Sequence, residues 1–196
     1  MTGGSLDADL ARTYAHLYAD AVRVLGAWTA PDAGQEGLRR SYADFLASHP
    51  DGLAKQGPPQ HLTASCVVLD ATGERVLLTL HRKARRWFQF GGHLEPTDRT
   101  LWHAARREAR EESGVPDLEP LPDPVTLDRH ALSSRFGHCR EHLDVRFAAL
   151  APDRAVPAVS SESLDVRWWP VDALPDDAEA ELSGLVARAR EVLGVG

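Results

Sequence analysis

Three glutamates near the middle of the chain are spaced so that they could bind one metal ion together. Glu108, Glu111 and Glu112 lie in the stretch LWHAARREAREESGV, whose composition is typical of a helix. At about 100° of rotation per residue, Glu111 and Glu112 fall within about 60° of Glu108 on the helix surface. Carboxylates at this spacing repel one another, and clustered carboxylate oxygens are the ligands that Mg²⁺ or Mn²⁺ prefers. We therefore predict a divalent-metal site on this helix.

The helix is expected to turn these glutamates inward. Leu101, Ala104 and Ala105 fall in the same sector as Glu108. Four basic residues fall on the opposite side, namely Arg99, His103, Arg106 and Arg110. A helix rich in Glu and Arg with exposed ion pairs is the ordinary alternative. Inward carboxylates without a partner are costly, so a bound cation accounts for the pattern better. Gly114 is expected to end the helix as its C′ residue.

The stretch from Gly92 to Val115 resembles the signature of the Nudix hydrolases, usually written GX5EX7REUXEEXGU with U an aliphatic residue. Gly92 matches the first glycine. The second half matches in order at Arg107, Glu108, Ala109, Glu111, Glu112, Gly114 and Val115. Asp98 stands where the signature has glutamate, eight residues instead of seven separate it from Arg107, and Phe90 stands where many members have proline. These departures affect the loop before the helix and leave the charged half intact.

The resemblance implies a reaction and a set of functional residues. In the family, the glutamates matching Glu108, Glu111 and Glu112 bind divalent cations, and the backbone carbonyl matching Gly92 supplies a further oxygen. The arginine matching Arg107 orients a glutamate, and here Arg107 and Glu111 are four residues apart, which makes their contact sterically available. The implied reaction is hydrolysis of a nucleoside diphosphate linked to another group, by attack of water on phosphorus with Mg²⁺ or Mn²⁺ as cofactor. We expect Arg107 and Glu111 to act in catalysis.

Many members of the family take a general base, or a further metal ligand, from a loop outside the signature. Glu162 in the stretch VSSESLDV is our candidate, because it directly precedes the last expected strand. Glu141 and Asp144 are alternatives, and a plain surface acid is the other interpretation of Glu162.

Four further residues are expected to contact the substrate. In REHLDVRF, the polar residues His142, Asp144 and Arg146 alternate with apolar ones, which predicts a strand with one apolar face. We expect the polar face to line the substrate cleft, although a solvent-facing side of a sheet is a common alternative. Arg82 in HRKARRW is expected to contact substrate phosphates, and an exposed end of a hairpin is its alternative.

Cysteine and histidine spacing gives no prediction of zinc. The two cysteines, Cys66 and Cys139, form neither a CxxC pair nor a disulfide framework. His138, Cys139 and His142 lie close together with His130 nearby, but the spacing HCREH matches no standard zinc pattern.

The remaining sequence predicts a mixed sheet between helices, preceded by a helical extension. Helical periodicity spans residues 5–28, with Ser5 or Asp7 as a possible cap, and residues 37–49. The expected strands cover residues 62–70, 75–83, 86–92, 124–133, 140–151 and 164–174, and a last helix covers 176–194. The fold class is therefore α/β (α+β), and the resemblance implies a Nudix-type α/β/α sandwich over residues 59–196 with an extension at 1–58.

Composition limits the partners. The 196 residues carry a formal net charge of −7, so generic binding to a nucleic-acid backbone is not expected. The sequence shows neither the features of a signal peptide nor an apolar run near the ~18 residues of a membrane span. We expect a cytoplasmic protein that acts on a small nucleotide, does not contact membranes, and can form a homodimer through the extension.

Two rival activities use the same fold. The resemblance implies that an isopentenyl-diphosphate isomerase would need a catalytic cysteine, histidine metal ligands and a degraded signature, whereas Cys66 lies in an apolar strand where a structural cysteine is typical. A non-catalytic nucleotide-binding or regulatory relative would lose signature carboxylates or add a DNA-binding domain. This sequence keeps the carboxylates and has no recognisable helix-turn-helix with a basic face, so hydrolysis is the preferred interpretation.

Overall fold

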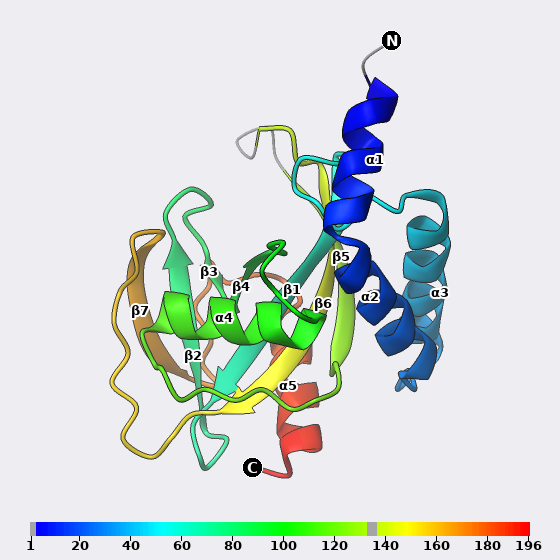
Figure 1. Cartoon of the computed structure of the whole chain (residues 1–196). Helices are drawn as coiled ribbons and strands as arrows, with labels where there is room; N and C mark the ends of the chain where they lie inside the picture. The colour runs from blue at the N-terminus through cyan, green and yellow to red at the C-terminus, as the bar shows by residue number, and fades with distance from the viewer. Residues whose placement is uncertain (1–2, 133–136) are drawn as a thin grey trace. The chain divides into compact units, whose positions relative to one another are not determined.

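The strands of the chain form one mixed sheet, and helices precede, interrupt and follow them. The computed structural model describes the backbone of residues 3–132 and 137–196. The helices of that part are Gly3–Thr13 (α1), Ala15–Ala27 (α2), Ala33–Ser48 (α3), Leu101–Ser113 (α4) and Leu182–Leu193 (α5). The strands are Gln60–Leu69 (β1), Arg75–His81 (β2), Trp87–Phe88 (β3), Phe90–His93 (β4), Thr126–Ala131 (β5), Glu141–Leu150 (β6) and Ser163–Pro170 (β7). The strand order is β3-β2-β1-β6-β5, with β4 paired to β1 and β7 paired to β2 (Figure 1). The predicted α+β class is confirmed.

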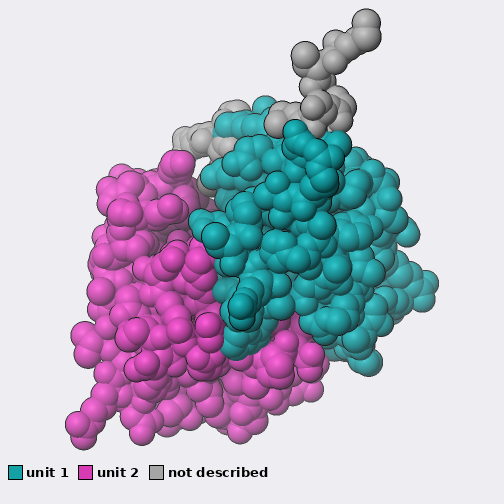
Figure 2. All heavy atoms as spheres, viewed as in Figure 1, with its two compact units in different colours: residues 1–64, 93–104, 126–145 teal, residues 65–92, 105–125, 146–196 magenta. Residues whose placement is uncertain are grey.

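Contacts divide the chain into two compact units, each assembled from several stretches of sequence. Unit 1 comprises residues 1–64, 93–104 and 126–145, and unit 2 comprises residues 65–92, 105–125 and 146–196 (Figure 2). The predicted division into an extension, 1–58, and a main domain, 59–196, follows the sequence and not these units, and it stays a prediction.

Unit 2 contains the predicted hairpin. β1 and β2 pair antiparallel, with Val68 opposite Leu77, and Gly73 in the turn between them has φ +72, a conformation that glycine adopts without steric cost. β7 pairs antiparallel with β2 as far as the pair formed by His81 and Ser163. The loop before β7 is thereby held beside the end of β2.

The hydrophobic core of unit 2 includes one face of α5. This helix buries Leu182, Leu185, Val186 and Ala189, whose spacing is that of a single helical stripe. The stripe packs in one cluster with apolar residues of the strands and of a connecting segment, namely Val67, Leu69, Val76, Leu78, Trp87, Val125 and Ala148.

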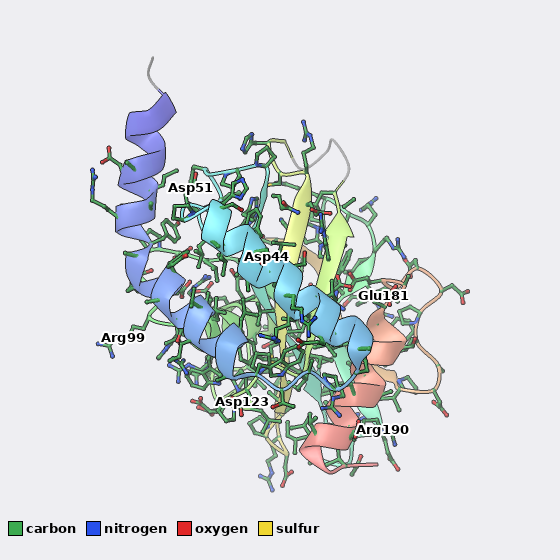
Figure 3. The ribbon with its side chains drawn as sticks, turned by 90° about the vertical axis from the view of Figure 1, so that its right-hand side faces the viewer. Asp44, Asp51, Arg99, Asp123, Glu181 and Arg190 are labelled. Atoms are coloured by element: carbon green, nitrogen blue, oxygen red, sulfur yellow. The ribbon has the colours of Figure 1, made fainter. Side chains whose placement is uncertain are left out.

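In unit 1, α2 and α3 lie side by side and α3 contacts β5 (Figure 1). Tyr42 of α3 is fully buried, and its hydroxyl donates to the backbone carbonyl of Asp128. The side-chain amide of Gln35 donates to the carbonyl oxygen of Leu127 at 3.0 Å and accepts from its N–H at 2.7 Å. Gln35 therefore satisfies the backbone hydrogen-bonding groups of Leu127 in β5, the last strand in the sheet order. Asp44 lies on the exposed side of α3 (Figure 3).

Two details of the helical prediction are wrong. The single helix expected over residues 5–28 is two helices, which meet at Tyr14, where the backbone leaves helical geometry (φ −98°, ψ 9°). Tyr14 is buried and its hydroxyl donates to the carbonyl of Leu94 at 3.3 Å, so a tertiary contact fixes the residue at the break. α1 begins at Gly3, so neither Ser5 nor Asp7 stands at the start of the helix.

The strand expected over residues 86–92 is two strands, β3 and β4, and the last helix begins at Leu182 and not at residue 176. The other expected elements agree with the structure to within about four residues. The strand expected over residues 124–133 ends at Ala131, and residue 133 lies outside the described residues. Among the helices described, none is long and apolar enough to cross a membrane.

Candidate metal and catalytic site

The start of α4 is capped by two side chains of unit 1. Thr100 precedes the helix, and its hydroxyl accepts from the N–H of His103 at 3.1 Å. Asp20 of α2 is 8% exposed, and its carboxylate accepts from the N–H of Leu101 at 2.8 Å. Free N–H groups at a helix start need such acceptors. The N-terminal helices therefore contribute directly to the first turn of the helix that bears the three glutamates.

The loop before α4 accommodates the residue that departs from the signature. Asp98 is buried, and its carboxylate accepts from the N–H of Glu95 at 2.8 Å. The N–H of Asp98 in turn donates to the carbonyl of Glu95 at 3.0 Å. The shortened acid thus closes a turn of the lengthened loop.

The end of α4 follows the prediction. The helix ends at Ser113, and Gly114 has φ +70. A Cβ atom at Gly114 would lie 2.6 Å from the Cβ of Ala158. Both the backbone conformation and the neighbouring loop therefore require glycine there.

Two of the three glutamates lie on the buried stripe of α4. Glu112 is 7% exposed and the Glu108 side chain is 15% exposed, which confirms the inward direction predicted for both. The prediction is wrong for Glu111, whose side chain is 62% exposed. The buried sector extends to Ala109 and Ser113, both fully buried, so its centre lies beyond Glu112 and Glu111 is left at its outer edge.

The glycine pair of β4 contacts both buried carboxylates. The N–H of Gly91 donates to Glu112 Oε2 at 3.0 Å. A Cβ atom at Gly92 would lie 2.6 Å from Glu108 Oε1, closer than real Cβ contacts allow. Glycine at position 92 is therefore required by the close approach of the Glu108 carboxylate to the strand backbone.

Arg107 holds two of the glutamates. Its Nη1 donates to Glu108 Oε1 at 2.9 Å and to Glu111 Oε2 at 3.3 Å. The contact with Glu111 that the four-residue spacing made available is present. The single guanidinium thus bridges a buried and an exposed carboxylate.

The surroundings of the two buried carboxylates disfavour their charged form. Burial, together with repulsion from Glu111 and Glu162, raises the pKa of Glu108 to about 7 against the opposing effect of Arg107. Burial also raises the pKa of Glu112 to about 8, with the hydrogen bond from Gly91 opposing it and Glu108 adding to it. A carboxylate whose pKa is raised in this way is stabilised in its charged form by a nearby cation.

Glu162 lies close enough to the two buried glutamates to contribute to the raised pKa of each. Its loop is held by Arg82, whose backbone N–H donates to the carbonyl of Glu162 at 3.0 Å. The Arg82 guanidinium donates to the carbonyls of Ser161 at 3.1 Å and Ser163 at 2.9 Å. Arg82 was expected to contact substrate, and the structure gives it three hydrogen bonds to the loop that carries Glu162.

The three polar residues of β6 lie in different surroundings. Asp144 is 3% exposed and accepts from the hydroxyl of Thr63 at 3.0 Å. Arg146 is 2% exposed and donates to both oxygens of Glu179, at 3.0 and 3.1 Å. The solvent-facing alternative is therefore wrong for Asp144 and Arg146. His142 is half-buried and belongs to unit 1, as Asp144 does, whereas Arg146 belongs to unit 2.

Two features of the structure were not predicted from the sequence: the capping contact of Asp20 and a cluster of histidines with one cysteine. Asp20 stands inside a helix far from α4 in the sequence, and nothing in its spacing points to a cap. His61 and His93 gather with Cys139 and His142, and the only sequence signal for this group was the His and Cys content of HCREH. The glutamates of the signature, by contrast, lie in one short stretch of sequence and could be predicted from their spacing.

Comparison with known proteins relates the chain to one protein family. Residues 59–189, more than half of the chain, match the family model of the NUDIX domain. No curated protein matches the chain. The chain is similar to a solved structure of a NUDIX-family hydrolase from Clostridium perfringens, with 22% identity, a TM-score of 0.54, and coverage of 68% of this chain and 96% of that one.

Two further solved structures have related folds. One is a C. elegans Ap4A hydrolase in a binary complex, with 19% identity, a TM-score of 0.55 and coverage of 68% and 97%. The other is the E. coli dihydroneopterin triphosphate pyrophosphohydrolase, with 18% identity, a TM-score of 0.54 and coverage of 66% and 92%. These identities show a shared fold, and the family match, together with the signature that surrounds the α4 carboxylates, shows that the chain belongs to the NUDIX family.

Proposed function

We propose that this protein is a divalent-metal-dependent hydrolase that cleaves a pyrophosphate bond in a nucleoside diphosphate linked to another group. The observation that carries the proposal is the pair of buried carboxylates, Glu108 and Glu112, held against the glycine backbone of β4. Two of the similar structures are named as enzymes that act on phosphate anhydrides. Family membership supports a hydrolase, and the substrate class is our inference.

The residues present fit a magnesium or manganese ion. Glu108, Glu111 and Glu112 offer carboxylate oxygens from adjacent turns of one helix, and Gly92 stands beside Glu108 and can supply its carbonyl. All four are hard oxygen donors. The raised pKa of Glu108 and of Glu112 is a second sign of fit, because the carboxylates repel one another until a cation neutralises them.

We assign the chain's own residues these roles. When bound, the cation would neutralise the diphosphate and polarise its phosphorus–oxygen bonds. Arg107 positions Glu108 and Glu111 through its two hydrogen bonds. Glu162, on an exposed loop of unit 2, is the proposed general base that accepts a proton from the attacking water.

The substrate contacts expected for His142, Asp144, Arg146 and Arg82 stay predictions. For Arg82 we propose a positioning role as well, since its hydrogen bonds fix the backbone on both sides of Glu162. The family match beginning at residue 59 supports the proposal that residues 59–196 form the catalytic domain. We further propose that the partner is a small nucleotide and not a nucleic acid, in keeping with the net charge of −7.

The isomerase alternative meets an obstacle at Cys66. This cysteine is fully buried in β1, and burial raises the pKa of its thiol, which disfavours the reactive thiolate. The binding-module alternative differs from the hydrolase only in turnover, so an activity measurement separates them.

The test is a hydrolysis screen with Mg²⁺ or Mn²⁺ against nucleoside triphosphates, dinucleoside polyphosphates, ADP-ribose and nucleotide sugars. Products are separated by anion-exchange chromatography, and ¹⁸O-labelled water reports attack at phosphorus. We expect metal-dependent turnover that Glu112→Gln abolishes. Glu119→Gln is the matched control, because Glu119 is an exposed acid that only pairs with Arg106 and Arg110. Metal binding without turnover on any compound would overturn the hydrolase proposal in favour of a binding protein.

A further inference from the structure

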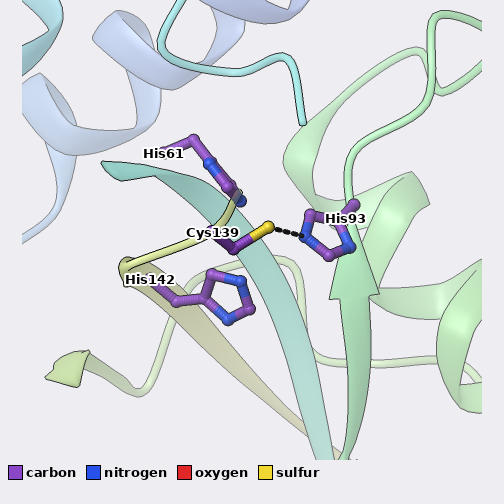
Figure 4. Close-up of side chains that lie close together, drawn as sticks. All are labelled: His61, His93, Cys139 and His142. Carbon is purple, nitrogen blue, oxygen red and sulfur yellow. Dashed lines mark hydrogen bonds between the residues drawn. The ribbon is translucent and has the colours of Figure 1, made fainter. Parts of the chain in front are cut away.

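Three histidines and a cysteine converge in unit 1, and none of them is one of the acidic residues of the signature. His61 lies at the start of β1, His93 at the end of β4, Cys139 in the segment before β6, and His142 near the start of β6 (Figure 4). One ligand atom from each lies within 4.8 Å of the others. His61 and Cys139 are buried, and His93 and His142 are half-buried.

The imidazoles already have the mutual spacing of ligands around one metal ion. The ring centroids of His61, His93 and His142 form a near-equilateral triangle with sides of 5.1, 5.2 and 5.1 Å. A zinc–nitrogen bond of about 2.1 Å places a ring centroid about 3.2 Å from the metal, so three tetrahedral imidazoles have centroids about 5.2 Å apart. The Sγ of Cys139 is 3.7 Å from Nε2 of His93, close to the ~3.5 Å between sulfur and nitrogen ligands of a tetrahedral zinc ion. Small ring rotations bring the ligand atoms together.

The state of His61 is an independent sign of a ligand. Its Nδ1 lies 3.1 Å from the carbonyl oxygen of Pro58. Because a carbonyl only accepts, Nδ1 carries the proton of the neutral ring, and the lone pair is on Nε2. That Nε2 is buried and has no hydrogen-bond partner among the described residues, and the same holds for Nε2 of His142. A buried polar atom left without a partner destabilises the fold unless a ligand satisfies it.

Unit 1 holds the four side chains in place through the backbone. The N–H of Arg140, between Cys139 and His142, donates to the carbonyl of Pro59 at 2.8 Å. Glu141 accepts from the side chain of Gln60 and from Arg129 at 2.9 Å. The start of β1 and the start of β6 are thus tied together next to His61, Cys139 and His142.

We propose that His61, His93, Cys139 and His142 form a closed tetrahedral site for a zinc ion, separate from the α4 carboxylates. Three imidazoles and a thiolate are borderline and soft donors that select zinc over magnesium. Four protein ligands leave no open position, which is the arrangement of a structural site. On binding, the Cys139 thiol loses its proton to solvent and the sulfur coordinates the metal. The ion would join three separate stretches of the chain in unit 1.

The test uses the full chain purified without chelators. Metal content by plasma mass spectrometry is expected to be about one zinc per chain in the wild type, in Glu112→Gln and in Cys66→Ser, which removes the other buried cysteine. Cobalt substituted for zinc is expected to give tetrahedral d–d bands and a thiolate charge-transfer band in all three proteins. Loss of a group that merely supports a ligand costs about 10–100-fold in metal affinity, so Cys139→Ser should lose more than about 100-fold and lack the thiolate band.

Competition with a chromophoric zinc chelator gives the affinity ratio. A wild type that holds no zinc and gives no cobalt–thiolate band overturns the proposal, as does a Cys139→Ser protein with unchanged affinity. His61→Gln provides a second variant that leaves the thiol in place. If Cys139→Ser does not fold, His61→Gln must still weaken zinc binding, and a cobalt spectrum without tetrahedral bands in the wild type decides against the site.

Discussion

The carboxylate cluster of unit 2 and the imidazole–thiol cluster of unit 1 differ in the donor atoms that they offer to a metal ion. Glu108 and Glu112 are hard oxygen donors whose negative charge is incompletely balanced. His61, His93 and His142 are nitrogen donors grouped with one sulfur donor, Cys139. In the first cluster Glu111 is exposed to solvent. In the second cluster all four side chains point toward one another (Figure 4). An open site of hard donors suits a cation that must meet substrate, and a closed site of softer donors suits an ion that stabilises the fold.

The strongest way to separate the two clusters is to neutralise Glu112. We expect Glu112→Gln to lower metal-dependent turnover on the order of 1,000-fold, because the charge stabilisation supplied by a catalytic cation amounts to several kcal/mol. The zinc content of the same protein should not change. Turnover is measured under saturating Mg²⁺, beside Glu119→Gln. Equal loss of turnover in both variants would mean that the effect is not specific to the buried carboxylate.

A methyl group at position 92 probes the same cluster from the strand. Gly92→Ala puts a Cβ atom 2.6 Å from Glu108 Oε1, so the carboxylate must move. We expect turnover to fall about 10–100-fold, since a displacement of ~1 Å in a reacting site costs rate on that scale. Steady-state kinetics with varied Mg²⁺ should show that part of the loss is recovered at high metal concentration. An unchanged rate would show that Glu108 need not occupy the position seen here.

The pH dependence of stability tests the raised pKa values of the carboxylate cluster. Glu108 and Glu112 have a folded-state pKa raised to about 7 and about 8, whereas burial lowers the pKa of His142. Unfolded histidines are mostly neutral above about pH 7, so between about pH 7 and 8 the folded protein binds more protons than the unfolded chain. Its free energy of unfolding therefore falls as pH rises through that range, on the order of 1 kcal/mol without Mg²⁺.

Denaturant unfolding at several pH values, in a buffer free of divalent cations, measures this slope. Glu112→Gln should reduce the slope and be more stable than the wild type at pH 8. The matched variant Glu111→Gln should keep the slope, because that side chain is exposed. Saturating Mg²⁺ should raise the stability of the wild type most at high pH. A wild type whose stability rises steadily from about pH 7 to 8 would contradict the raised pKa values.

The smallest expected effect concerns the cap that α2 provides to α4. Asp20→Ala removes the acceptor for the N–H of Leu101, and loss of a helix cap costs about 1–2 kcal/mol. Thermal unfolding measures the cost, and Asp9→Ala, which removes an exposed acid that pairs with Arg12 in α1, is the control. Equal stability of the two variants would mean that Thr100 alone suffices to cap the helix.

The same comparison explains how much could be predicted from the sequence. The carboxylate cluster lies on one helix beside the preceding strand, so helical spacing and the signature were enough to predict the inward direction of Glu108 and Glu112 and the contact of Arg107 with Glu111. The exposure of Glu111 was missed because the centre of a buried stripe depends on what packs beside it, which spacing alone does not give.

The imidazole–thiol cluster could not be predicted for a different reason. Its four residues come from three stretches of the chain, because only Cys139 and His142 are near neighbours in the sequence. Sheet pairing brings them together, and no local pattern encodes which strand ends will meet. The capping contact of Asp20 with α4 was hidden in the same way, since the two residues are 81 positions apart.

The most direct test of the central claim is a titration with Mn²⁺ followed by electron paramagnetic resonance at pH 8.5, where both buried carboxylates are ionised. The wild type and Glu119→Gln should bind Mn²⁺ with equal affinity, and so should a Cys139→Ser protein that remains folded, because the thiol belongs to the other cluster. Glu112→Gln should bind at least about 10-fold more weakly. Unchanged Mn²⁺ affinity in Glu112→Gln would contradict the account, since the buried carboxylates of α4 would then not be the ligands of the divalent cation.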